Sequence, residues 1–270
     1  MDPLDVVKGA LPPIVAALLL VGLAGARWLP SAVALGVFVA HWLLKGLPPW
    51  PHELWSAPEG RAWLLWGVVA GALLAQLEAL QAIRGRFAEL AGGVAALAAV
   101  WFLLQKQAAR WPAGDVVLFV EVGGIGVALL VLACRRAIAT APAGVPTAVV
   151  FSLLLAVDAG LVAWQGAATF GQLCGAAAAA LGAGAATNVW RKPFALTPAD
   201  GTWIGLAHGL FVLAGVHLGS LPWSAAGCAL VAPCGLLLLR PGMRSGAHTA
   251  LAVLLLAIPL GGAIWFVLPA

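Results

Sequence analysis

The sequence predicts an all-α membrane protein, a polytopic bundle of transmembrane helices with short loops. Of the 270 residues, 63% are hydrophobic and only 9% are charged, whereas a soluble domain typically carries about 25% charged residues. The apolar residues gather into runs close to the roughly 20 residues that a membrane-spanning helix needs, which suggests about ten spans, nine at the fewest. No loop is long enough for a soluble domain. Residues 1–270 are therefore expected to form a single integral membrane domain.

Each expected span is an apolar run that ends near basic, proline or tryptophan residues. The first begins with Pro12 and Pro13 in its first helical turn, where a missing N–H costs little, and it closes at Arg27. The longest polar segment, residues 46–61, is rich in proline and tryptophan and is expected to lie on the membrane surface. The expected spans cover residues 11–28, 31–47, 62–80, 87–105, 116–134, 145–164, 167–189, 203–221, 222–239 and 247–268.

The N-terminus allows two interpretations. Ala24-Gly25-Ala26 follows an apolar run and resembles a signal-peptidase site. However, two aspartates offset Lys8, so the segment that precedes the run is not basic as a signal peptide requires. We expect an uncleaved first span, with a signal peptide as the alternative.

The basic residues are divided unequally between the two sets of loops. The loops after odd-numbered spans carry Arg27, Arg84, Arg86, Arg135, Arg136, Arg191, Lys192, Arg240 and Arg244. The other side carries Lys8, Lys45, Arg61, Lys106 and Arg110. Because cytoplasmic loops are enriched in Lys and Arg, both termini are expected outside, in a bacterial cytoplasmic (inner) membrane. Single and paired cations at span ends do not form a phosphate-tracking surface, so no nucleic-acid partner is expected.

Two acidic residues inside expected spans are the main site candidates. A charge in hydrocarbon costs from about 2.5 kcal/mol to far more, so such residues are functional candidates by default. Asp158 lies near mid-membrane, and Glu121 lies just below the outer end of its span, beside three glycines. We interpret both as ion- or proton-coupling residues. The alternative for each is an interhelical hydrogen bond that only fixes packing. No lysine or arginine lies deep enough in a span to be an obvious partner of Asp158.

Other polar residues in the spans are assigned structural roles. Glu78 lies near a span end with Arg84 not far beyond, which predicts an interfacial ion pair or a snorkelling carboxylate. His208 and His217 are separated so that they lie about 180° apart around a helix and about 13 Å along it. They cannot share one metal or haem, and both are expected to be hydrogen-bonded packing residues.

No catalytic residue, metal site or cofactor is predicted. The sequence contains no HExxH, GxSxG or P-loop motif. The four cysteines lack CxxC spacing and are interpreted as small apolar packing residues. They are Cys134, Cys174, Cys228 and Cys234.

Pairs of glycines at four-residue spacing predict close helix packing, because a residue without a Cβ lets a second backbone approach. The predicted packing residues are Gly67, Gly71, Gly171, Gly175, Gly205, Gly209, Gly215 and Gly219. The span at 167–189 consists almost entirely of small residues. It is expected at the centre of the bundle or at an oligomer contact.

Two classes of function fit this sequence best. The first is a small permease or ion- or proton-coupled transporter, with Asp158 and Glu121 at the translocation site. The second is a non-catalytic structural subunit of a larger membrane complex. A membrane-embedded lipid-modifying enzyme is a third possibility, although the protein is not expected to be an enzyme. The expected partners are the lipid bilayer and either further copies of the chain or other membrane subunits.

Overall fold

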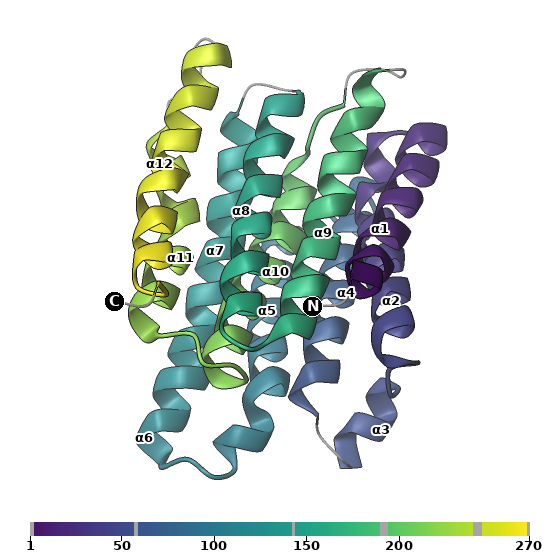
Figure 1. Cartoon of the computed structure of the whole chain (residues 1–270). Coiled ribbons are helices and arrows are strands. Elements are labelled where there is room, and N and C mark those ends of the chain that lie inside the picture. The colour runs from purple at the N-terminus through teal and green to yellow at the C-terminus, as the bar shows by residue number, and fades with distance from the viewer. Residues whose placement is uncertain (1–2, 57–58, 142–143, 190–193, 240–244, 269–270) are drawn as a thin grey trace.

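The computed structural model describes residues 3–56, 59–141, 144–189, 194–239 and 245–268. Among these residues all regular structure is helical and no strand occurs (Figure 1). Eight helices in this part of the chain are long and apolar enough to cross a membrane. The predicted all-α membrane bundle is confirmed. Four basic residues used for the expected orientation lie outside the described residues: Arg191, Lys192, Arg240 and Arg244.

The described part of the chain contains ten longer helices and six short helical elements. The long helices are α1 (Pro3–Ala24), α2 (Leu29–Lys45), α4 (Gly60–Ala79), α5 (Gly85–Ala108), α7 (Gly123–Thr140), α8 (Val145–Trp164), α9 (Ala168–Ala186), α10 (Pro198–His217), α11 (Trp223–Gly235) and α12 (Ser245–Trp265). The short elements are η1 (Ala26–Trp28), α3 (Pro51–Ser56), α6 (Ala113–Val116), η2 (Val117–Val122), η3 (Thr187–Val189) and η4 (Leu236–Leu238). Besides these eight candidate spans, the described residues contain a shorter apolar segment, Trp223–Leu238, which comprises α11 and η4.

The first helix begins earlier than predicted. Because α1 starts at Pro3, Pro12 and Pro13 lie inside it and not in its first turn. Pro3 is itself the proline at the helix start, a position that proline favours. Gly36 of α2 lies against these internal prolines, and a Cβ added to Gly36 would clash with the backbone of Pro13. The absence of a side chain at Gly36 therefore lets α2 pack directly against the proline-containing turn.

Helix α10 is the central helix of the bundle. Of the residues in its apolar stretch, 94% are buried, against at most 61% in the other seven candidate spans. It contacts α2, α4, α5, α7, α8, α9 and α11, and Figure 1 shows it between the α1–α2 edge and the α11–α12 edge. The sequence favoured the span at 167–189 for this place or for an oligomer contact. Helix α10 takes the central place, and α9 packs chiefly against α8, α1 and α2, while the oligomer contact stays a prediction.

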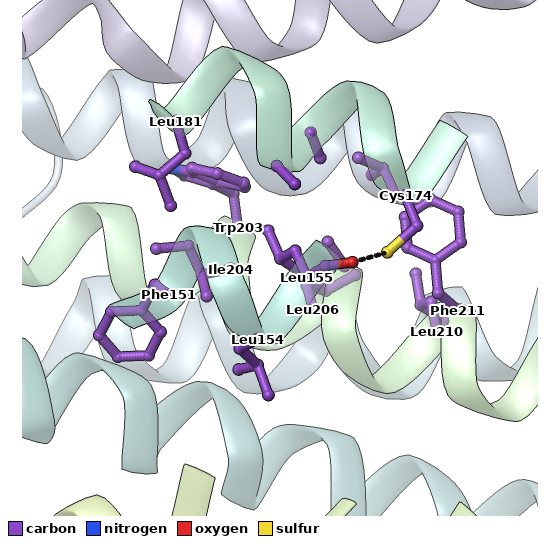
Figure 2. Packing of buried hydrophobic residues seen from close by; sticks show 14 of the residues in the cluster. Phe151, Leu154, Leu155, Cys174, Leu181, Trp203, Ile204, Leu206, Leu210 and Phe211 are labelled. Carbon is purple, nitrogen blue, oxygen red and sulfur yellow. Dashed lines mark hydrogen bonds between the residues drawn. The ribbon is translucent and has the colours of Figure 1, made fainter. Parts of the chain in front are cut away.

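The core where α8, α9 and α10 meet is filled by large side chains (Figure 2). Phe151, Trp203 and Phe211 are each at most 1% exposed. The thiol of Cys174 donates to the carbonyl of Leu155 at 3.2 Å, which joins α9 to α8. Within the described part of the chain the cysteines are free thiols.

Helix α10 crosses α7 on a ladder of glycines. A Cβ added to Gly201 would lie 2.5 Å from Arg135 N, and one added to Gly205 would lie 2.7 Å from Val131 Cα. One added to Gly209 would lie 2.8 Å from a valine methyl one further turn back along α7. The residues of α7 are met in reverse order, so the two helices are antiparallel and their backbones are in contact.

The other glycines of the expected packing set also face helices of this chain. An added Cβ would lie 2.8 Å from Leu210 Cδ1 at Gly67, and 2.6 Å from Ala159 O at Gly171. At Gly175 the nearest atom, a methyl of α8, is at an ordinary 3.8 Å. Gly71 and Gly215 each have a side-chain neighbour within 3.3 Å. Gly219 lies in the turn after α10, and the atom nearest to an added Cβ there is the carbonyl oxygen of Gly215 in α10 itself, at 2.6 Å. These faces are therefore occupied within the chain itself.

Replacing Gly205 with alanine is expected to destabilise the protein by about 1–3 kcal/mol, as overpacking generally does. The added methyl would meet the backbone of Val131, which cannot move aside as a flexible side chain can. The free energy of unfolding in detergent measures the effect. Gly93→Ala in α5 is the control, because no described atom lies within 4 Å of a Cβ there. Equal losses of stability in the two variants would contradict the role of Gly205.

Candidate functional site

Asp158 of α8 and His208 of α10 form a pair inside the bundle. Asp158 Oδ2 lies 2.6 Å from His208 Nδ1, and both side chains are 0% exposed. The sequence predicts Asp158 as a coupling residue and shows no lysine or arginine that could pair with it. In the structure its partner is His208, a histidine for which the sequence predicts only a packing role. The two residues are 50 positions apart. Local spacing therefore gives no indication of the pair.

A proline in α11 supplies the second hydrogen bond of His208. In an α-helix the carbonyl of Ala229 would accept from the N–H four residues later, but that residue is Pro233, which has none. The carbonyl of Ala229 instead accepts from His208 Nε2 at 3.1 Å. Pro233 thus opens an acceptor in the bundle interior, and the imidazole of the central helix binds it. This is the signal in the sequence that could have pointed to His208.

These two bonds determine how many protons the pair holds. Because a carbonyl only accepts, His208 Nε2 carries a hydrogen. The contact at 2.6 Å between Nδ1 and Asp158 Oδ2 needs one further proton, on either atom. The pair is then a carboxylate beside an imidazolium, or a carboxylic acid beside a neutral imidazole. Both arrangements have a net charge of zero, which is what a position without water exposure favours.

Asp158 has an oxygen that is still able to accept. Its Oδ1 atom is buried and has no hydrogen-bond partner among the residues that the structure describes. A buried polar atom without a partner costs about 1–3 kcal/mol. Oδ1 is therefore the position at which the pair can take a further proton or accept from a further donor while both existing bonds remain.

The structure does not bring Glu121 to this pair. Glu121 lies in the π-helical segment η2 and is exposed, next to the exposed apolar residues Val117, Leu118 and Val122. In a membrane protein an exposed apolar face of a span meets lipid or another membrane protein. π-Helical turns are rare and are frequent at functional sites. Glu121 therefore belongs to the outer surface of the bundle, whereas Asp158 belongs to its interior.

Glu78 pairs with a residue of another helix and not with Arg84. The partner is Arg135 of α7. Its Nη1 and Nη2 atoms donate to the two carboxylate oxygens of Glu78 at 2.5 and 2.8 Å. Nη1 also donates to Thr202 Oγ1 of α10 at 2.7 Å. Arg84 instead donates from Nε to the carbonyl of Gln81. The bidentate pair joins α4, α7 and α10 near the crossing at Gly201. It is a structural link, as predicted, but with a different partner.

His217 lies apart from the Asp158–His208 pair. Its ring is packed among Trp111, Phe119 and Trp223, with ring centroids 5.2–5.3 Å apart. Across the described ranges of the chain, no group of three or more His, Cys, Asp or Glu side chains is arranged to hold a metal ion.

Comparison of the chain with protein-family models, with curated proteins and with solved structures gives no match. A fold does not determine a function, so the function has to be argued from the chemistry of the site.

Proposed function

We propose that this multi-pass membrane protein is a proton-coupled transporter of a small solute and that the Asp158–His208 pair carries the proton. The observation that supports this proposal is the fully buried carboxyl–imidazole pair that joins α8 to the central helix α10. Ionisable residues inside transmembrane bundles mark proton relays and ion pathways in pumps and transporters. The sparse polar interior suits a small solute and not a large polar one.

The proton is taken up at Asp158 Oδ1. A proton on this oxygen produces a carboxylic acid whose Oδ2 still accepts from Nδ1–H, while Nε2–H still donates to the carbonyl of Ala229. The pair then carries a charge of +1 in the bundle interior. Because an uncompensated charge there is unfavourable, the proton must leave again or be balanced by a negative group. This requirement couples proton occupancy to the presence of a solute or to a change in conformation.

Helix α11 is the element best placed to respond to the proton. It has 13 residues, fewer than a full span, and continues into the 3-10 turn η4 after Pro233. Its Ala229 carbonyl is bonded to His208. A change in the charge of the imidazole therefore acts directly on the backbone of α11.

Replacing Pro233 with alanine is expected to lower transport about tenfold, which corresponds to about 1.4 kcal/mol, the scale of one hydrogen bond. The new N–H at position 233 would bond to the Ala229 carbonyl and compete with His208 Nε2. Proton-coupled current from reconstituted protein measures the effect. Pro259→Ala in α12 removes a second internal proline and serves as the control. Wild-type current in Pro233→Ala would show that the freed carbonyl has no role.

The proposed function is tested with purified protein in liposomes on a solid-supported membrane. The external pH is stepped down, and small solutes are added one at a time. A solute that produces a current only in the presence of both the protein and the pH gradient supports the proposal. A broad panel of solutes without any current above that of protein-free liposomes would count against it.

A second candidate function is that of a structural subunit in a larger membrane complex, and Glu121 is the observation that favours it. A carboxylate on the exposed surface of a span is unfavourable in lipid and would be matched by a cationic residue of a neighbouring subunit. Native mass spectrometry of protein from its own membrane tests this function. A stoichiometric partner that is lost in Glu121→Gln would support it, and a lone chain in both samples would count against it.

A further inference from the structure

A small cavity lies at the end of the bundle where α2 ends and α4 begins, near α3 (Figure 1). Its volume is about 230 Å³. The polar residues that line it come from α2, α4, α9 and the residue before α4: His41, Lys45, Glu59, Arg61 and Thr169. We propose that this cavity binds one phosphate group, either free or in the headgroup of an anionic lipid.

The two cations of this cavity form no ion pair with any residue that the structure describes. Lys45 and Arg61 are exposed, and in the described ranges no carboxylate lies within 4 Å of either charged group. Glu59 is the acidic residue that lines the cavity, so the lining carries two positive charges and one negative charge. The excess of positive charge attracts an anion. Arg61 adds a planar donor pair of the kind that binds phosphate in a bidentate manner.

A histidine with a buried ring nitrogen that has no partner among the described residues also lines the cavity. His41 is 9% exposed, and its Nδ1 atom is buried without a hydrogen-bond partner in the part of the chain that the structure describes. Leaving such a group unpaired costs about 1–3 kcal/mol. In the tautomer that has its hydrogen on Nδ1, the His41 ring would donate to a phosphate oxygen in the cavity, and Thr169 provides a hydroxyl donor from α9. The two exposed cations and the buried ring nitrogen without a partner together form the proposed oxyanion site.

The first turn of α4 adds to the same preference. The helix begins at Gly60, and the amides at a helix N-terminus carry a partial positive charge that favours anions. Arg61 lies in this turn and lines the cavity. None of these residues belongs to the Asp158–His208 pair. A result against the phosphate site therefore does not count against the proposed proton site, and the reverse also holds.

A neighbouring cavity provides a matched control. It has a volume of about 560 Å³, shares Glu59 and Arg61 with the first cavity, and is also lined by Lys106 and Arg110. Lys106 and Lys45 are both exposed lysines on the same end of the bundle, but each lines only one of the two cavities. Removing either one changes the overall charge equally. Only Lys45→Gln removes a ligand of the proposed site.

The site is tested by titrating inorganic phosphate into the full-length protein in phosphatidylcholine nanodiscs, with calorimetry as the readout. We expect saturable binding that weakens about tenfold in Lys45→Gln and that changes less than about twofold in Lys106→Gln. Arg61→Gln is expected to weaken phosphate binding as Lys45→Gln does. Equal weakening of phosphate binding by the two lysine variants would overturn the site.

A second arm distinguishes the source of the phosphate group. The titration is repeated in nanodiscs that contain phosphatidylglycerol, and native mass spectrometry records how much of this lipid stays bound. Loss of phosphate binding, with lipid retained by the wild type and released by Lys45→Gln, assigns the site to a lipid headgroup. Unchanged phosphate binding assigns it to a free anion. Lipid retention that is identical in the wild type and Lys45→Gln, together with no phosphate binding in phosphatidylcholine, refutes both.

Discussion

Replacing Asp158 with asparagine should reduce proton-coupled transport about a hundredfold, the lower range of what a positioned proton-transfer group contributes. Asparagine has nearly the same shape as aspartate but does not take up a proton. Its amide would donate to Nδ1 of a neutral His208, while Nε2–H still donates to the carbonyl of Ala229. The structure of the site is therefore kept while its proton is removed. The current evoked by a solute that drives the wild type measures the loss.

Asp200→Asn is the matched control for this experiment. Asp200 of α10 is a second buried carboxylate, but it closes a capping box with Thr197 at the start of that helix and is not part of the pair. We expect Asp200→Asn to transport like the wild type. Thermal unfolding shows whether each variant is folded. A folded Asp158→Asn protein with wild-type current would exclude Asp158 as the proton carrier.

Replacing Glu78 with glutamine should destabilise the bundle by about 3–5 kcal/mol, the usual loss when one partner of a buried ion pair is removed. The side chains of Arg135 and Glu78 are 7% and 16% exposed, so the guanidinium has little access to water once its carboxylate is gone. The variant leaves a buried positive charge among α4, α7 and α10. The free energy of unfolding in detergent measures the loss.

Two further variants isolate the charge as the cause. Glu89→Gln changes an exposed carboxylate of α5 and should leave the stability almost unchanged. The double variant Glu78→Leu/Arg135→Met should recover most of the loss, because well-packed apolar residues often replace a buried ion pair without cost. A Glu78→Gln protein as stable as Glu89→Gln would show that the pair contributes nothing.

The fold could be predicted from the sequence because its determinants are local. The length of an apolar run decides whether a helix can cross the membrane, and neighbouring residues establish that length. Asp158 was recognised for the same reason, since a lone carboxylate in an apolar run is visible without knowledge of the fold. The early start of α1 was missed because two adjacent prolines normally mark the beginning of a helix and here lie inside it.

The partners of these residues could not be predicted because they depend on how distant helices pack. His208 is 50 residues from Asp158, and Arg135 is 57 residues from Glu78, whereas Arg84 is close in sequence but bonds elsewhere. The outward direction of Glu121 was hidden for another reason. The π-helical segment η2 departs from the regular helical repeat, so periodicity does not place its side chains. Of these long-range contacts, only the bond from His208 to the Ala229 carbonyl has an indication in the sequence, which is Pro233, the residue that leaves this carbonyl without its helical donor.

The central claim, that Asp158 and His208 take up and release a proton, is tested most directly by infrared difference spectroscopy during a pH step. This measurement needs no knowledge of the solute, because a sufficiently low pH drives the proton onto Asp158 by mass action alone. We expect the wild type to show a carboxylic-acid band that grows as the pH falls and shifts in D₂O, and we expect this band to be missing from Asp158→Asn. Identical difference spectra for the two proteins would contradict the claim.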